Sequence, residues 1–150
     1  MKWLKNNYYH VNREWQYKNI EPKIIIEKYI ESNSDNNLFD YKIFCSKSVP
    51  FLIQVDVDRF RNHTRVLFDI DWNKTDIIYN NYPLAEIDIV RPNNLQEMLD
   101  LASTLTKYLN FCRVDVYNEN QQIIFGEMTF SPAAGFGKFT PDYYDNVYGN

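Results

Sequence analysis

The sequence predicts an α+β fold built on an antiparallel sheet. Three observations support this class: short segments rich in β-branched and aromatic residues, one amphipathic pattern of helical period, and a later pair of alternating segments joined by a polar turn. The expected order of strands, helix and hairpin is that of an α+β domain. With 150 residues, the chain has the length of one ordinary domain.

The first expected strands lie in the first half of the chain. Residues 23–30 follow Pro22 and contain three consecutive isoleucines, which favours a strand. A polar stretch then predicts a loop, and further strands are expected at 41–45, 51–57 and 64–70. Because the connections between these strands are of turn length, the sequence predicts an antiparallel meander.

One helix is expected over residues 93–109. Asn93 or Asn94 can cap it, and Glu97 lies in its first turn, where the helix dipole favours an anion. Apolar residues recur at steps of three and four and form one stripe: Leu95, Met98, Leu99, Ala102, Leu105 and Leu109. A short terminal helix is expected after Pro141.

Residues 111–130 are expected to form a β-hairpin with a distinct polar face. On its first strand this face carries Arg113, Asp115 and Tyr117, because successive side chains alternate. On its second strand the odd positions are expected on that face: Ile123, Phe125, Glu127 and Thr129. With an odd turn of about three or five residues, Asp115 stands across from Glu127 or diagonal to it.

Asp115 and Glu127 are therefore candidate ligands of a divalent metal ion. Two neighbouring carboxylates repel each other unless a cation lies between them, and Mg²⁺ takes carboxylate and phosphate oxygens together. Arg113, on the same face, is placed to hold a phosphate oxygen. An ordinary charged strand face in water is the alternative explanation for this pair.

A longer motif extends the metal hypothesis: Arg-x-Asp at 113–115, then Glu-x-Thr-x-Ser-Pro-x-x-Gly at 127–135. It resembles the metal-binding signature of ATP-grasp enzymes such as D-alanine–D-alanine ligase, in which Asp, Glu and Asn hold Mg²⁺ on the phosphates of ATP. The resemblance implies that Asp115, Glu127 and Thr129 bind Mg²⁺ or Mn²⁺, with Thr129 where Asn is usual. It also implies a catalytic role for Arg113.

Residues 25–30 resemble the ATP-grasp linker whose backbone contacts the adenine edge. Together with the next acidic and basic residues, the resemblance implies a set of nucleotide contacts: Glu27, Lys28, Ile30, Asp40 and Lys42. Glu27 would face the adenine amino group, and Asp40 is the nearest candidate for the ribose. An amphipathic strand and a surface lysine would explain the same residues without a nucleotide.

Further strings carry the resemblance over residues 6–149, among them Arg13-Glu14-Trp15 and Asp71-Trp72-Asn73. They are similar to the ATP-grasp branch linked to teichuronopeptide and capsular polysaccharide biosynthesis, whose members are often labelled glycosyltransferases. ATP-grasp enzymes clasp ATP between two lobes, and nothing before Glu27 has the length or the glycines of the first. We therefore expect 1–150 to be one partial domain, the C-terminal lobe. It would be truncated, paired with a separate N-terminal lobe, or part of a homo-oligomer.

The resemblance implies an ATP-dependent carboxylate–amine ligase that acts on a glycopolymer or an amino acid. ATP would phosphorylate a carboxylate, and an amine would displace the phosphate. The alternative is a non-catalytic remnant that binds nucleotide or serves as an assembly module. A metal nuclease is disfavoured, because Thr129 stands where its Glu-x-Lys motif needs lysine.

Composition argues against several other classes of protein. A formal charge of −4 and a pI near 5.1 argue against a nucleic-acid-coating protein. No apolar run approaches the roughly 20 residues of a membrane span, and the start lacks a signal peptide, so we expect a soluble, cytoplasmic chain. Isolated Cys45 and Cys112 indicate neither disulfides nor zinc. Either an anion-binding strip or a solvated edge strand explains four alternating residues: Arg59, Arg61, His63 and Arg65.

Overall fold

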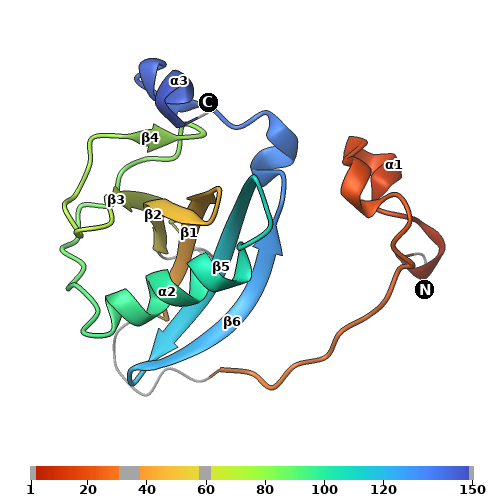
Figure 1. Cartoon of the computed structure of the whole chain (residues 1–150), viewed down its shortest axis with the longest axis horizontal. Coiled ribbons are helices and arrows are strands. Elements are labelled where there is room, and N and C mark those ends of the chain that lie inside the picture. Colours follow the sequence, from red (N-terminus) through yellow and green to blue (C-terminus); the bar gives the residue numbers. More distant parts are fainter. Residues whose placement is uncertain (1–2, 31–37, 58–61, 149–150) are drawn as a thin grey trace.

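A computed structural model describes residues 3–30, 38–57 and 62–148, and its architecture is α+β (Figure 1). Five strands form an antiparallel sheet in the order β3-β2-β1-β5-β6. Their bounds are β1 Asp40–Ser46, β2 Val49–Val57, β3 Thr64–Phe68, β5 Phe111–Glu119 and β6 Gln122–Thr129. A small second sheet pairs β4 (Ile78–Tyr79) with β7 (Phe139–Thr140). The expected fold class and meander are confirmed.

The main helix is shorter than expected, and its start is fixed in a different way. It is α2 (Leu95–Leu105), and residues 106–108 form a turn. The side chain of Asn94 does not cap it. Instead, Asn94 Nδ2 donates to Asn118 Oδ1 (3.2 Å) and to Gln121 O (2.9 Å), which ties the start of α2 to the tip of the β5–β6 hairpin.

The remaining helical elements are short and lie towards the two ends of the chain. They are η1 Trp3–Lys5, α1 Tyr9–Asn12, η2 Trp15–Tyr17, η3 Pro132–Gly135 and α3 Tyr143–Tyr148. The position of α3 confirms the helix expected after Pro141. Across the described ranges, the search for a helix long and apolar enough to cross a membrane finds none.

The two faces of the sheet differ in chemistry, and this difference positions the site. The α2 side is an apolar core to which every strand of the main sheet except β6 contributes fully buried residues, such as Ile43, Val55, Val66 and Val114. On the opposite face, an aromatic and aliphatic cluster around Phe44 and Tyr79 occupies one end. Buried charged side chains of β1, β2 and β5 occupy the rest of that face.

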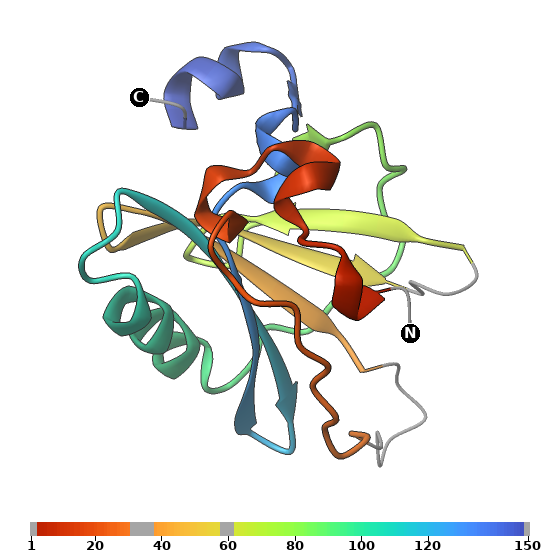
Figure 2. The same ribbon diagram turned by 90° about the vertical axis from the view of Figure 1, so that its right-hand side faces the viewer.

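Residues 23–30, expected as a strand, have no regular secondary structure, so that prediction is wrong. Ile25 and Ile26 are 81% and 91% exposed. Strand preference reflects packing against neighbouring strands, and this segment pairs with no strand of the described residues. Figure 2 shows the N-terminal segment, red to orange, passing in front of the main sheet.

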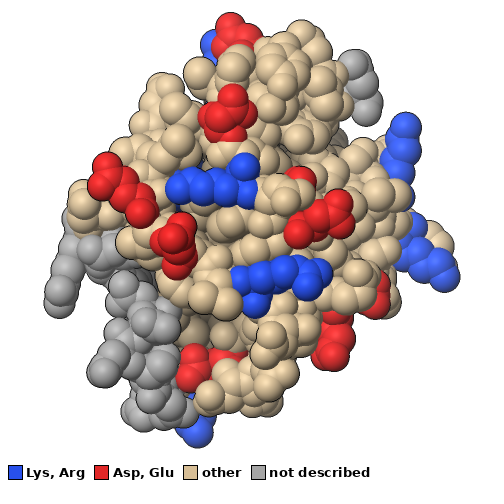
Figure 3. All heavy atoms as spheres, turned by 90° about the vertical axis from the view of Figure 1, so that its left-hand side faces the viewer, with Lys and Arg blue, Asp and Glu red and all other residues tan. Residues whose placement is uncertain are grey.

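Acidic and basic side chains are interspersed on the face drawn in Figure 3, without a continuous basic stripe on that face.

Candidate functional site

The turn of the β5–β6 hairpin has two residues, so the expected odd length is wrong. Asn120 and Gln121 form it with φ of 52° and 64°, the left-handed values that two-residue hairpins use. Continued without interruption, this register would pair Glu127 with Val114 and turn Glu127 to the other face. The strand therefore needs a correction before it reaches Glu127.

A β-bulge at Gly126 supplies this correction. The register shifts so that Val116 lies opposite Phe125, while Asp115 lies directly opposite Glu127. A side chain at position 126 would bring its Cβ to 3.0 Å from the Asp115 carbonyl oxygen, which is why glycine suits the bulge. The expected cross-strand pair forms, but through a bulge rather than through the turn.

The bulge also changes which residues of β6 share a face. Ile123 and Phe125 were expected beside Glu127, and this grouping is wrong. Their cross-strand partners place them on the α2 side, where Ile123 packs against the apolar core, while Ile124 lies opposite Tyr117 on the polar face.

Buried charges gather around Asp115 on the polar face. Lys42 lies opposite Asp115 in the β1–β5 register, and its Nζ is 2.6 Å from both Asp40 Oδ2 and Asp115 Oδ2. All three side chains are less than a tenth exposed. We call these residues, with their neighbours on β5 and β6, the Asp115 cluster: Asp40, Lys42, Arg113, Asp115, Glu127 and Thr129.

Arg113 joins the three expected metal ligands. Its Nε donates to Asp115 Oδ1 at 2.7 Å and its Nη2 to Asp115 Oδ2 at 2.8 Å. The same Nη2 donates to Thr129 Oγ1 at 3.1 Å and lies 3.4 Å from Glu127 Oε1. Oxygens of Asp115, Glu127 and Thr129 therefore converge on one cationic nitrogen.

Burial and charge compete within the Asp115 cluster. Burial raises the pKa of Asp40, and the neighbouring Lys42 ammonium opposes the rise. For Arg113 burial acts to lower the pKa, but the hydrogen bonds and charge of Asp115 outweigh it and the pKa is raised. With the three carboxylates ionised, Lys42 and Arg113 leave the cluster one unit negative. One further positive charge would therefore neutralise the cluster.

The oxygen atoms of Asp115, Glu127 and Thr129 are of the chemical type that binds a hard cation. Two carboxylates and a hydroxyl are oxygen ligands, which Mg²⁺ and Mn²⁺ prefer. Both oxygens of Asp115 are nevertheless occupied by Lys42 and Arg113. Within the described ranges, no group of three or more His, Cys, Asp or Glu side chains lies close enough to hold a metal. Any ion here would depend on the two carboxylates, the hydroxyl and outside ligands.

A hollow of about 680 Å³ opens beside this cluster. The sheet side contributes Arg113, Glu127 and Thr129, and the following loop contributes Ser131. The N-terminal segment closes the other side with four polar residues: Tyr8, Asn12, Glu14 and Tyr17. No role was predicted for any of them from the sequence; the available signal was the family-like string Arg13-Glu14-Trp15, which contains Glu14.

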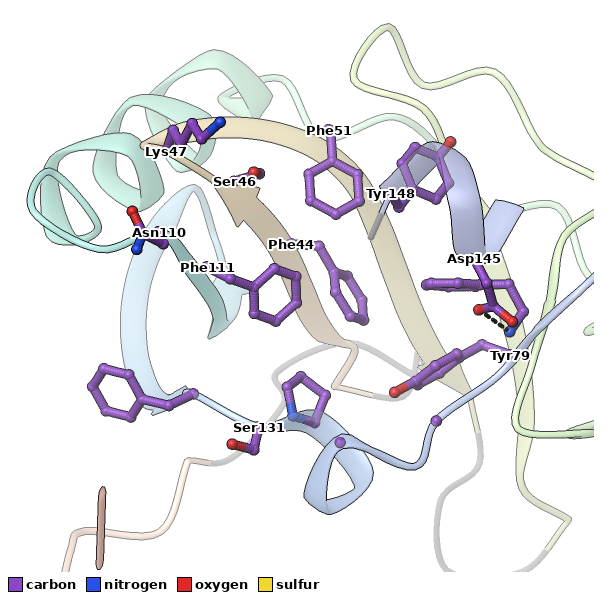
Figure 4. Close-up of a pocket in the computed structure, with 15 residues that line it drawn as sticks. Phe44, Ser46, Lys47, Phe51, Tyr79, Asn110, Phe111, Ser131, Asp145 and Tyr148 are labelled. Carbon is purple, nitrogen blue, oxygen red and sulfur yellow. Dashed lines mark hydrogen bonds between the residues drawn. The ribbon is translucent and has the colours of Figure 1, made fainter. Parts of the chain in front are cut away.

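An aromatic pocket of about 480 Å³ lies next to the hollow and shares Ser131 with it (Figure 4). Figure 4 shows rings from separate segments around it, among them Phe44, Phe51, Phe111 and Tyr148. No local sequence pattern predicts this pocket, because these residues come together only through the sheet and the C-terminal segment.

The expected nucleotide residues fall into two groups. Asp40 and Lys42 belong to the Asp115 cluster. Glu27, Lys28 and Ile30 lie in the irregular N-terminal segment, and the last two line a separate hollow beside the hairpin tip. The structure therefore does not bring all five residues to one place.

A second charged cluster lies further along the polar face. Asp56 Oδ1 accepts from Arg65 Nε at 2.8 Å and from Gln54 Nε2 at 2.7 Å, and His63 Nε2 lies 3.3 Å away. Arg65 also stacks over the Tyr82 ring, 3.6 Å from its centroid. We call Gln54, Asp56, His63 and Arg65 the Asp56 cluster. Two residues of the expected basic strip, His63 and Arg65, therefore pair with a buried aspartate. The other two, Arg59 and Arg61, lie outside the described residues.

Comparison with known protein families gives one match, to TupA-like ATPgrasp, over residues 1–150. No curated protein and no solved structure matches the sequence significantly. The family match covers the N-terminal segment, both clusters and the β5–β6 hairpin, which agrees with the resemblance found over residues 6–149. The chain belongs to the TupA-like ATP-grasp family.

Proposed function

We propose that the chain binds ATP with Mg²⁺ or Mn²⁺ at the Asp115 cluster. One observation carries the proposal: oxygens of Asp115, Glu127 and Thr129 already converge on a cation, Nη2 of Arg113. Family membership supports it, because this donor set is the one that the ATP-grasp signature would supply.

In this proposal Asp115, Glu127 and Thr129 hold the metal, and Arg113 turns its guanidinium towards a phosphate. Arg113 Nη1 makes no hydrogen bond within the described part of the chain, so part of its donor capacity is free for an anion. Lys42 Nζ donates to Asp115 Oδ2 at 2.6 Å and so holds that carboxylate in place. The metal would shield negative charge on the phosphates.

The nucleotide contacts are proposed from the family resemblance. Glu27, Lys28 and Ile30 take the adenine edge, and Asp40 the ribose. Lys28 and Ile30 are available for this role, because their segment engages no strand and lines an open hollow. Bringing them to the Asp115 cluster requires the N-terminal segment to move, or a partner to complete the site.

The proposed reaction is a carboxylate–amine ligation of cell-envelope or capsular polysaccharide biosynthesis. A glycopolymer or an amino acid is the proposed substrate, and a separate N-terminal lobe or a second copy of the chain the proposed partner. The aromatic pocket supports this reading, because it offers an apolar surface for a ring beside the phosphate-facing hollow.

The second candidate is a non-catalytic remnant that binds nucleotide or serves as an assembly module. It is favoured by the saturation of Asp115, whose oxygens are both held by Lys42 and Arg113. In this case the cluster stabilises the sheet and needs no ion.

Calorimetric titration of ATP into the full chain tests the proposal, with and without Mg²⁺. We expect Mg²⁺ to strengthen binding in the wild type, and Glu127→Gln to remove that gain. Glu86→Gln, an exposed glutamate outside the cluster, is the control and should keep the gain. A Mg²⁺ effect of equal size in the wild type and Glu127→Gln refutes the metal assignment. ATP binding without any Mg²⁺ effect would favour the second candidate.

A further inference from the structure

The N-terminal segment folds back on itself through specific contacts. Asn7 Nδ2 donates to the carbonyl oxygens of Lys18 and Ile20, each at 3.0 Å. The ring of Tyr8 packs edge-on against Tyr17, with centroids 5.2 Å apart. These contacts fix the loop between the two tyrosines, where Glu14 lies.

A hydrogen bond anchors this loop over the Asp115 cluster. Gln16 Nε2 donates to Ser131 Oγ at 2.8 Å, which joins the loop to the segment that follows β6. As a result Glu14 and Tyr17 line the same hollow as Glu127 and Arg113. The pKa of Tyr17 is raised by burial and then by Glu14, with a smaller contribution from Glu127.

Among the residues that the structure describes, Glu14 is a buried carboxylate without a cationic partner. The residue is only 8% exposed, and within the same ranges the one hydrogen bond to its carboxylate is a long one from Gln16 Nε2, at 3.4 Å. No Lys, Arg or His side chain in the described part of the chain forms an ion pair with it. Carboxylates withdrawn from water are normally paired, so the surroundings of Glu14 suit a cation that comes from outside the chain.

We propose that Glu14 recognises the ammonium group of an amine ligand in this hollow. The inference rests on the proposed function, in which an amine is the second substrate, and assigns its recognition to a named residue. Glu127 faces Arg113 at 3.4 Å, so Glu14 is the carboxylate left for the ligand. A carboxylate that hydrogen-bonds an ammonium group holds it through charge-assisted contacts, which a neutral alcohol of the same shape cannot match.

The test is a titration of the ¹⁵N-labelled full chain with propylammonium chloride, followed by amide chemical shifts, without nucleotide or metal. Propanol is the neutral probe of similar shape. We expect saturable shifts at Tyr17, Glu127 and Ser131 with propylammonium and none with propanol. Glu14→Gln should weaken binding about ten- to hundredfold, whereas Glu21→Gln, an exposed glutamate of the same segment, should leave it unchanged.

Glu14→Asp keeps the charge but withdraws it by one methylene, and we expect binding between the wild type and Glu14→Gln. It also provides a second test if Glu14→Gln does not fold. Equal binding by Glu14→Gln and the wild type, equal shifts with propanol, or no saturable shift at all overturns the assignment. Because the titration uses no ATP, a failure here refutes the role of Glu14 alone. A missing Mg²⁺ effect on ATP binding refutes the proposed function instead.

Discussion

The Asp115 and Asp56 clusters share a sheet face and similar chemistry but differ in what surrounds them. In each, a buried aspartate on a central strand is held by an arginine at 2.7–2.8 Å. Around Asp56 the arginine is also stacked on Tyr82, and the carboxylate opposite it across the β1–β2 pair, that of Asp40, is buried. Around Asp115 a second carboxylate, that of Glu127, is 65% exposed and borders a hollow.

This difference separates a structural ion pair from a candidate site. Buried pairs of charges often add little net stability, but removing one partner is costly in either cluster. Removing the exposed carboxylate of Glu127, beside the hollow, does not carry this cost. We therefore expect substitutions to change stability in both clusters, and to change ligand binding only around Asp115.

The largest expected effect is that of Lys42→Met, which leaves Asp40 and Asp115 without their shared ammonium. We expect the free energy of unfolding to fall by about 3–5 kcal/mol. Lys23→Met, at an exposed lysine, should stay within about 0.5 kcal/mol. Chemical denaturation measures both, and a loss below about 1 kcal/mol for Lys42→Met would contradict the buried-network description.

The same variant has a signed pH dependence. Burial already raises the pKa of Asp40, and Lys42 is the main group that opposes the rise, so Lys42→Met should raise it further. A carboxyl whose folded pKa lies above its unfolded value, near 4, holds its proton more tightly when folded. The stability of the variant should therefore fall as pH rises through the raised pKa, and its deficit should be smaller at pH 5 than at pH 8. A deficit independent of pH would contradict this.

Asp56→Asn should have the next largest effect. It removes the charge that Arg65 and Gln54 bond, so we expect a loss of about 2 kcal/mol in denaturation experiments. Asp88→Asn, at an exposed position, is the control. The gain in ATP affinity from Mg²⁺ should be that of the wild type, and its loss would erase the distinction between the two clusters.

Gly126→Ala tests the bulge that aligns Asp115 with Glu127. The added Cβ meets the Asp115 carbonyl oxygen at 3.0 Å, so we expect a loss of about 1–2 kcal/mol. Gln122→Ala, at an exposed position of β6, should change stability little. Cross-strand NOEs between Asp115 and Glu127 report the register, and unchanged NOEs with unchanged stability would show that the bulge tolerates a side chain.

Thr129→Val should have the smallest effect on stability, about 0.5 kcal/mol, because the hydroxyl is only partly buried. It removes the oxygen that accepts from Arg113 Nη2 and donates to Glu127 Oε1. Under the proposed function it also weakens the Mg²⁺ effect on ATP binding, whereas Thr129→Asn preserves it. Calorimetry distinguishes the two, and equal Mg²⁺ effects in both variants would remove Thr129 from the ligand set.

The sequence predicted the elements that local pattern determines. Segments rich in β-branched and aromatic residues located β1, β2 and β3, alternation located the β5–β6 hairpin, and the three- and four-residue stripe located α2 within a few residues. Alternation also predicted the pairing of Asp115 with Glu127, although with a turn of the wrong length. The motif at 113–135 and the further strings predicted the family to which the chain belongs.

Features that depend on tertiary context were beyond the sequence reasoning. The isoleucines at 24–26 favour a strand, but the described chain offers them no partner strand. The bulge at Gly126 adds one residue to β6, which allows a two-residue turn and the pairing of Asp115 with Glu127 in the same hairpin. Alternation alone does not show such an extra residue. The position of Glu14 depends on a hydrogen bond between Gln16, in the same loop, and Ser131, which lies 115 residues further along the chain.

The most direct test of the central claim is the binding of Mn²⁺ in the presence of ATP, measured from the electron paramagnetic resonance signal of the free ion. The wild type, Glu127→Gln and Asp56→Asn are compared at equal concentrations of folded protein. We expect the wild type and Asp56→Asn to bind Mn²⁺ with similar affinity, and Glu127→Gln to lose at least tenfold in affinity, or about 1.4 kcal/mol. Binding retained by Glu127→Gln, or lost only in Asp56→Asn, would contradict the assignment of the metal to the Asp115 cluster.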